Sequence, residues 1–297
     1  MKKLALALTL FAACGTTKSI AADMAVKALP MPAPVASWTG FYAGVNAGYG
    51  RGDASSTNNP VDPASQIFFS DPTFGTTFNT AFRQAGAIAG VQVGYNWQFS
   101  GQAVFGFEAD LQYSDMHGTG IARTLPLFGG FIEYDADTER RLRWFGTVRG
   151  RLGFLVTPNL LLYGTGGLAY GETESRGDIK INPLLPNGQV VIQVIQNQTV
   201  LSCRNQAPAS ALCYQGSNSE TQLGWAAGAG GEWKLAPNWS LKAEYLHVGL
   251  PGTSATLSAA APSTPDVKTV FKFNSQNFDL VRLGVNYQFG GPIVAKY

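Results

Sequence analysis

Residues 85–99, AGAIAGVQVGYNWQF, alternate between an apolar face and a face of glycines, amides and one isoleucine. A period of two predicts a β-strand. The apolar, odd-numbered face ends in Tyr95, Trp97 and Phe99, whereas the other face is rich in glycine and amides. This polarity is inverted relative to a strand of a soluble sheet. It is typical of a strand with lipid outside and a narrow polar lumen inside.

Seven further segments alternate in the same way, at about 38–50, 103–114, 141–155, 160–171, 222–234, 239–248 and 278–289. In segment 141–155 the pattern predicts Leu142 and Trp144 outward and Arg143 inward. An even number of antiparallel strands can close without leaving an unpaired edge. The sequence therefore predicts an all-β fold, an eight-stranded antiparallel transmembrane β-barrel.

The connections between these segments alternate between long and short. Tight turns are expected at 100–102, 157–159 and 237–238, and long loops at 51–84, 115–140, 172–220 and 249–276. Outer-membrane barrels have short periplasmic turns and long extracellular loops. Within the longest loop, residues 189–200 are expected to form a hairpin with residues 178–182 across Pro186-Asn187-Gly188.

The ends of the chain predict export. Met-Lys-Lys, an apolar stretch from Leu4 to Ala13 and the small residues before Ala22 are typical of a secretory signal. We therefore expect a signal peptide at 1–21, a Pro-rich periplasmic segment at 22–37, the outer-membrane barrel at 38–290 and a tail at 291–297. An alternative is lipidation of Cys14, which follows Phe11-Ala12-Ala13.

Composition excludes several classes of protein. No apolar run after the signal is long enough for a transmembrane helix, and mean hydropathy is close to zero. The precursor has a formal charge of +2, but the predicted signal peptide carries three lysines and no acid. The mature chain is therefore slightly acidic, which argues against a nucleic-acid partner.

Charged residues on the inward faces are the clearest candidate site. Alternation places nine of them in the lumen: Glu108, Asp110, Arg149, Arg151, Glu232, Lys234, Lys242, Glu244 and Arg282. An eight-stranded barrel has room for side chains and little else, and buried charges are tolerated when they pair. We therefore expect a paired-charge plug; the alternative is an ion pathway.

Aromatic residues cluster at the short-turn ends of the outward faces: Trp97, Phe99, Trp233, Trp239, Tyr287 and Phe289. Such a cluster is typical of an interfacial girdle in a membrane. A soluble lipocalin-type barrel would instead point its apolar face inward, without a girdle. We therefore expect contact with outer-membrane lipid.

Residue types that carry catalysis or bind metal are sparse. The two histidines, His117 and His247, have no ligand partner at metal-binding spacing, and Ser254 follows a proline near His247. Gly164-Thr165-Gly166-Gly167 has no following helix, so it does not resemble a phosphate loop. We expect no catalytic residues, no metal and no cofactor.

Two cysteines of the mature chain, Cys203 and Cys213, lie in the longest loop. Exported chains meet an oxidising compartment, and little entropy is lost in closing so short a segment. The sequence predicts a disulfide between them.

Several motifs together resemble a known family. They are WTGFY at 38–42, NAGYG at 46–50, GYNW at 94–97, EAD at 108–110, GTVRGRLG at 146–153, YGTGGLAY at 163–170, LKAEY at 241–245 and VRLGVNYQF at 281–289. The chain resembles the alphaproteobacterial outer-membrane immunogenic proteins, grouped with opacity-like surface antigens in the OmpA-like β-barrel superfamily and often labelled porins. The last motif resembles the signal read by the barrel-assembly machinery, although Gly290 to Lys296 intervene before the terminal Tyr297.

Taken together, these patterns predict an outer-membrane protein with a structural or surface-interaction role, as an antigen or adhesin-like protein. Its partners would be membrane lipid, the barrel-assembly machinery and a host or surface ligand at the long loops. The alternatives are a small-solute porin and, less favoured, an enzyme that modifies membrane lipids. Fold resemblance alone does not decide between these activities.

Overall fold

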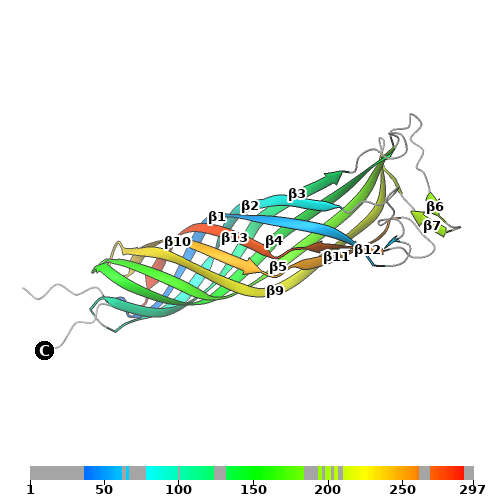
Figure 1. The fold of residues 1–297 in the computed structure, drawn as a ribbon. Coiled ribbons are helices and arrows are strands. Elements are labelled where there is room, and N and C mark those ends of the chain that lie inside the picture. Colours follow the sequence, from blue (N-terminus) through cyan, green and yellow to red (C-terminus); the bar gives the residue numbers. More distant parts are fainter. Residues whose placement is uncertain are drawn as a thin grey trace, which may run out of the picture. The chain divides into compact units, whose positions relative to one another are not determined.

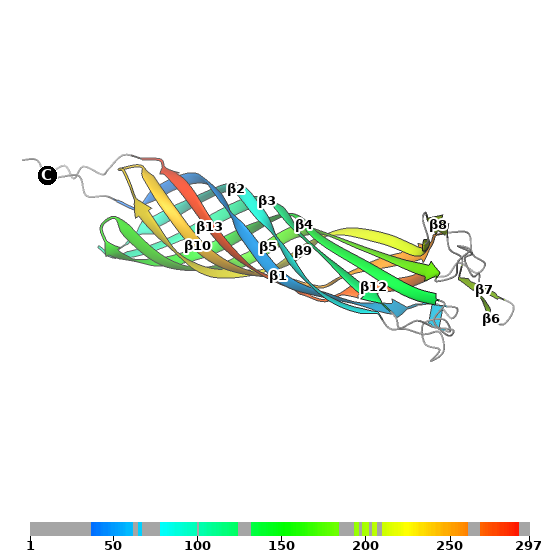
Figure 2. The same ribbon diagram turned by 90° about the horizontal axis from the view of Figure 1, so that it is seen from above.

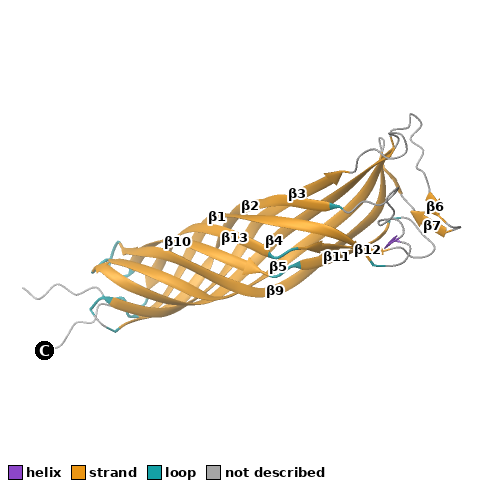
Figure 3. Cartoon of the chain, viewed as in Figure 1, coloured by secondary structure: helices purple, strands orange, loops and turns teal. Residues whose placement is uncertain are grey.

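Strands make up most of the described chain in the computed structural model (Figure 3). The structure describes residues 37–61, 65–66, 78–99, 101–123, 132–183, 193–195, 198–201, 204–206, 210–260 and 268–290. The predicted signal peptide, the tail at 291–297 and residues 22–36 of the Pro-rich segment lie outside this part. Among the described residues, no helix has the length and apolar character needed to cross a membrane.

The described residues form one large sheet of eleven strands in the unit Val35–Tyr297, and ten of these strands lie on one continuous path of pairings (Figure 1). Their bounds are β1 Gly40–Pro60, β2 Asn79–Gln98, β3 Ala103–Arg123, β4 Ile132–Thr157, β5 Leu160–Pro183, β9 Ser210–Lys234, β10 Trp239–Leu250, β11 Thr253–Ala259, β12 Lys268–Phe273 and β13 Gln276–Gln288. The short β8 (Arg204–Gln206) pairs with β9, while β6 (Gln193–Ile195) and β7 (Gln198–Leu201) pair with each other.

Every pairing in the large sheet is antiparallel. β1 to β5 pair in chain order, β5 pairs with β9, and β9 pairs with β10. β10 then pairs with β13, and β13 pairs with β1. Figures 1 and 2 show these strands tilted in a common sense, with consecutive strands side by side.

Short connections follow β2, β4 and β9, at the three places where the sequence predicts tight turns, although the one after β9 is longer than predicted. The four predicted long loops were wrong in extent. β1 continues to Pro60, β3 to Arg123 and β5 to Pro183, while β9 begins at Ser210. The alternation persists in these extensions with reversed polarity: Ala54 and Phe82 are buried, whereas Asp53 and Arg83 are exposed. The outward residues of these extensions are polar, so a pattern of apolar outward residues does not reveal the extensions.

Two strands are interrupted at the level where the polarity reverses. β10 ends before Pro251 and β11 begins at Thr253, while β12 ends before Asn274 and β13 begins at Gln276. Proline has no N–H to donate to a ladder. The carbonyls exposed by the breaks accept hydrogen bonds from buried side chains: Arg140 Nη1 donates to Asn274 O at 2.7 Å, and Gln222 Nε2 donates to Pro251 O at 3.0 Å.

The predicted hairpin between 178–182 and 189–200 was wrong. Asp178 pairs with Gln215 and Ile181 with Ala211, so this part of β5 continues its ladder with β9. The turn signal at Pro186-Asn187-Gly188 lies outside the described residues. Residues 178–181 pair with β9 because the ladder between β5 and β9 is long, and local turn residues do not reveal the length of a ladder.

The predicted facing is wrong at one point of β4. Leu142 is fully buried and the Arg143 side chain is 55% exposed, the reverse of the expectation. The ladder between β4 and β5 shifts register between Leu142 and Trp144. One extra residue in a strand changes which side chains face outward beyond it, and a strict period of two cannot reveal such a bulge.

The outward apolar residues of the strands form a zone that we call the apolar band. Two belts of outward aromatic residues flank it. The belt near the tight turns contains all six predicted girdle residues, each at least 37% exposed. A second belt at the other end of the band includes Tyr49, Tyr113, Trp225 and Tyr245. The second belt lies at or near the ends of the strands that the sequence predicts, so the sequence pattern does not reveal it as a belt.

Candidate functional site

The inward charges come from five strands whose residues alternate between outside and interior. Glu108 and Asp110 lie on β3, Arg149 and Arg151 on β4, Glu232 on β9, Lys242 and Glu244 on β10, and Arg282 on β13. All eight are at most 4% exposed. We call these eight residues the charge network.

Arg149 and Arg282 form the centre of the charge network. Arg149 Nη2 lies 2.6 Å from Glu108 Oε1 and 2.8 Å from Asp110 Oδ2, and its Nη1 lies 3.1 Å from Glu244 Oε1. Arg282 Nη2 lies 2.9 Å from the same Asp110 oxygen and 2.5 Å from Glu244 Oε2. Two guanidinium groups thus bind three carboxylates contributed by two other strands.

The remaining bases extend the network toward the tight turns. Lys242 Nζ lies 2.6 Å from Glu108 Oε1, and Arg151 Nη2 lies 2.8 Å from Glu232 Oε2. Two tyrosine hydroxyls donate to the carboxylates: Tyr42 to Glu108 at 2.8 Å and Tyr163 to Glu244 at 3.0 Å. These tyrosines were not among the predicted site residues, although alternation already put Tyr42 on the inward face.

Lys234 lies apart from the predicted network. Its ammonium donates to the carbonyl of Ser37 and to Gln288 Oε1 at 2.7 Å, and it lies 4.8 Å from the centre of the Trp38 ring. Among the described residues it makes no ion pair with a carboxylate. It lies at the end of its strand, where backbone carbonyls are free to accept.

Four acids and four bases make up the charge network, so its formal charges cancel. Moving ions out of water costs several kcal/mol each unless close partners compensate. The short distances and the added hydroxyl donors supply that compensation. The arrangement can therefore hold charge inside a narrow interior without a bound counter-ion.

Apolar side chains fill the interior beyond the charge network. Moving away from the tight turns, the next inward residues beyond Arg282 on β13 are Leu280 and Phe278. The next inward residues beyond Glu244 on β10 are Leu246 and Val248. With these pack Ile88, Met116, Leu142, Phe145, Ala169, Ala226 and Leu250. We call this set the apolar layer. It was missed because the inward face was expected to be polar throughout.

A second apolar cluster fills the interior of the strand extensions and includes Phe78, Tyr134, Ile179, Tyr214 and Phe271. At the tight-turn end, Trp38 packs with Val104, Leu155, Leu161 and Tyr163. Beside Trp38, a cavity lined also by Glu232 and Gln288 has a volume of about 10 Å³. That is about the volume of one water-sized probe.

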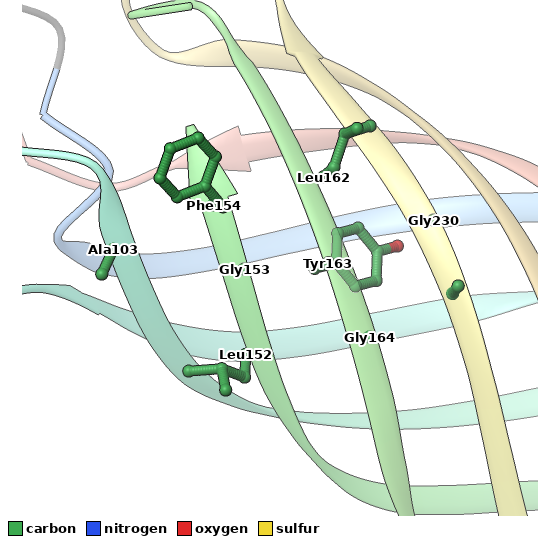
Figure 4. Close-up of a pocket in the computed structure, with 9 residues that line it drawn as sticks. Ala103, Leu152, Gly153, Phe154, Leu162, Tyr163, Gly164 and Gly230 are labelled. Atoms are coloured by element: carbon green, nitrogen blue, oxygen red, sulfur yellow. The ribbon is translucent and has the colours of Figure 1, made fainter. Parts of the chain in front are cut away.

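One apolar groove lies outside this interior. It has a volume of about 780 Å³ and is lined by residues of β3, β4, β5 and β9, among them Leu152, Phe154 and Leu162 (Figure 4). Leu152, Phe154 and Leu162 belong to the outward apolar band. Outward residues of a membrane barrel that contact hydrocarbon are expected to be apolar. Lipid chains therefore suffice to explain the apolar lining of this groove.

Neither histidine lies in a cluster that could hold a metal ion, within the part of the chain that the structure describes. His117 Nδ1 lies 2.8 Å from the carbonyl of Asp115. His247 Nδ1 lies 2.7 Å from Asp279 Oδ1, a partner from a different strand that sequence spacing did not reveal.

Of the two predicted disulfide partners, Cys213 is fully buried and disulfide-bonded. Cys203 lies outside the described residues.

Comparison with known proteins agrees with this architecture. The family model described as outer membrane protein beta-barrel domain matches residues 21–289. The chain is 34% identical to the 31 kDa outer-membrane immunogenic protein of Brucella melitensis over 94% of this chain and 96% of that protein. The chain belongs to the outer-membrane β-barrel family.

Other relatives are more distant. The 22 kDa outer membrane protein of Rhizobium leguminosarum is 33% identical over 49% of each chain. Among solved structures, the outer membrane protein OprG from Pseudomonas aeruginosa matches with a TM-score of 0.39 and 11% identity, covering 84% of this chain and 97% of that one. The predicted family and the predicted location in the outer membrane are confirmed.

Proposed function

We propose that this outer-membrane protein is a closed, plugged, eight-stranded barrel. The strand segments beyond the apolar band, which we call the extension, would project to the exterior. The pairings of β9 with β10, β10 with β13 and β13 with β1 support closure, with β11 and β12 continuing β10 and β13. Closure removes the unpaired edges that lipid does not tolerate. The short turns are then periplasmic and the extension is extracellular, as in other outer-membrane barrels.

The filled interior is the observation that carries the proposed plug. A path along the barrel from the tight turns would first meet the apolar residues packed around Trp38 and then the charge network. It would next meet the apolar layer and finally the apolar cluster inside the strand extensions. A small-solute porin needs a water-filled lumen, and eight strands leave only enough width for side chains. The plug therefore favours a structural and surface role over a porin.

A role at the surface is supported by the relatives and by the extension. The Brucella proteins are named for immunogenicity. In this chain, the outward face of the extension carries polar residues such as Asp53, Thr57 and Asn59, which suit contact with water and with a host or surface ligand. The barrel-assembly machinery would insert the chain through its last strand, residues 281–289.

An enzyme that modifies membrane lipid is the weaker alternative. Such an enzyme needs a nucleophile within hydrogen-bond reach of its base. His247 is bonded to Asp279 through Nδ1, and no serine among the described residues forms a hydrogen bond with its ring. The proposed function therefore assigns no catalytic residue and no cofactor.

Conductance measurements test the plug. The refolded protein is added to a planar lipid bilayer at a concentration at which a sixteen-stranded porin gives stepwise increases in ion current. We expect no such current steps from this protein. Insertion is checked in parallel by heat-modifiable migration on unboiled gels. Regular, long-lived ion steps from the folded protein would contradict the plug and favour the porin.

A further inference from the structure

A polar groove opens on the outward side of β1, β10 and β13, where the apolar band ends. It has a volume of about 770 Å³, and its lining includes Arg51, Asp53, His247, Ser275, Asn277 and Asp279. Here β1 changes partner: its ladder with β13 ends at the pair Asp53–Asn277, and its ladder with β12 begins at Ser56–Phe273. The strand break therefore creates the groove.

One wall of this groove is held in place by hydrogen bonds. Asp279 Oδ1 lies 2.7 Å from His247 Nδ1 and accepts a hydrogen bond from the Tyr245 hydroxyl at 2.5 Å. The His247 ring also packs against Trp225, with 5.3 Å between ring centres. A carboxylate and an imidazole are thus oriented before any ligand arrives, which lowers the entropic cost of binding.

Charged groups of both signs remain available in the groove. Arg51 is exposed and makes no ion pair among the described residues, while Asp53 and Arg83 are 3.8 Å apart and almost fully solvated. Sugar hydroxyls both donate and accept hydrogen bonds, so they match a lining of carboxylates, guanidinium, amide and hydroxyl groups. A bare phosphate would favour an excess of cations, which Asp53 and Asp279 beside Arg51 and Arg83 do not provide.

The residues directly beneath the groove are apolar. Tyr49 precedes Arg51 by two positions on β1, Val281 follows Asp279 by two on β13, and both side chains are about 60% exposed on the outward face. A ligand in this groove would therefore have a polar part among the charges and a hydrocarbon part along the barrel wall.

We infer that this groove, which we call the headgroup groove, binds the sugar headgroup of a glycolipid in the outer leaflet, with its acyl chains over Tyr49 and Val281. This inference rests on the proposed orientation, which places the extension outside the cell. Arg51 and Asn277 donate to sugar oxygens, and Asp53 and Asp279 accept from sugar hydroxyls.

Binding of rough lipopolysaccharide, which carries a short sugar core, tests the inference. Fluorescently labelled rough lipopolysaccharide is titrated against the refolded full chain in zwitterionic detergent. Arg51→Ala and Asp279→Asn are each expected to weaken binding at least tenfold. Arg176→Ala, which removes an exposed arginine on β5 outside the groove, is expected to leave binding unchanged. Heat-modifiable migration shows that each variant is folded, and Arg51→Ala alters only an exposed side chain.

Competition separates the sources of the ligand. Delipidated core oligosaccharide is expected to compete at least tenfold more weakly than the intact lipid, and phosphatidylglycerol is expected not to compete. Equal binding by all variants, or equal competition by phosphatidylglycerol, would overturn the site. Equal competition by the free oligosaccharide would replace the glycolipid with a soluble saccharide. Surface labelling of the extension tests the orientation separately, so failure of the groove and failure of the proposed function remain distinguishable.

Discussion

Arg149 lies among three carboxylates in the interior, and its loss would leave them without one of their central cations. Because breaking a buried ion pair leaves uncompensated charge, Arg149→Ala is expected to lower the free energy of unfolding by about 3–5 kcal/mol. The exposed Arg143, on the same strand, is the matched control, and Arg143→Ala should cost less than about 1 kcal/mol. Urea unfolding in detergent, followed by gel migration, measures both. Equal effects would mean that the interior charges are solvated.

Lipid contact can be tested at single outward residues. Val93 and Ile121 are both about 60% exposed, but Val93 lies in the apolar band and Ile121 in the extension. Arginine at a lipid-facing position near the midplane costs about 2–4 kcal/mol, so Val93→Arg should destabilise the protein by that amount. Ile121→Arg should be close to neutral in the same unfolding assay in lipid vesicles. A neutral Val93→Arg would place the membrane elsewhere on the barrel.

Tyr134 offers a pH-dependent readout of the extension. Burial raises the pKa of Tyr134 to about 12, whereas a tyrosine in the unfolded chain ionises near its ordinary value of about 10. Above pH 10 the unfolded state therefore loses a proton that the folded state keeps, and stability falls as pH rises. Between pH 8 and pH 11.5, wild type should lose about 2 kcal/mol more than Tyr134→Phe in denaturant unfolding. Identical losses would show that Tyr134 is solvated.

The facing of a single residue can be predicted from the sequence where its side chain follows the local alternation. The eight members of the charge network were all found in this way, because each lies on a regular stretch of strand. Lys234 was grouped with them, but its partners come from the chain segment before β1 and from the end of β13, which alternation does not describe. The same holds for the pair of His247 and Asp279, which depends on the register between β10 and β13.

At the scale of strands, the alternation predicted where strands exist but not where they end. β4 illustrates both outcomes: Val148, Leu152 and Phe154 face outward as expected, while the register shift near Leu142 reverses the facing beyond it. The extensions were assigned to loops because their outward residues are polar. A period of two with apolar residues inward is the pattern of a soluble sheet, and it begins where the membrane band ends.

The extension predicts a clear labelling pattern on whole cells. Asn59 is exposed on β1, near the far end of the extension, and Gly101 is exposed in the tight turn between β2 and β3, with open space around it. A cysteine at Asn59 should react with an impermeant maleimide on intact cells. A cysteine at Gly101 should react only after the outer membrane is permeabilised. The opposite pattern would place the extension in the periplasm and remove the basis for a surface role.

At the scale of the whole molecule, the proposed plug consists of two different layers that follow one another in the interior. In this proposal, the charge network would exclude solutes by occupying space with paired ions. The apolar layer, where the ring centres of Phe145 and Phe278 are 5.7 Å apart, would exclude water. Apolar constrictions block ions by dewetting even when they are not closed by atoms. The proposed plug therefore does not depend on the charges alone.

Removing two central charges of the network is accordingly expected not to open a conducting path. A variant carrying Arg149→Met and Glu108→Gln should remain silent in planar bilayers, because the apolar layer is intact. Adding Phe145→Ala and Phe278→Ala removes two rings from that layer and should produce ion steps, provided that unboiled gels show a folded barrel. Conduction by the first variant would mean that the apolar layer does not seal the interior. Silence of the folded four-residue variant would mean that the remaining side chains, or the cluster of the extension around Phe271, close the path without these two rings.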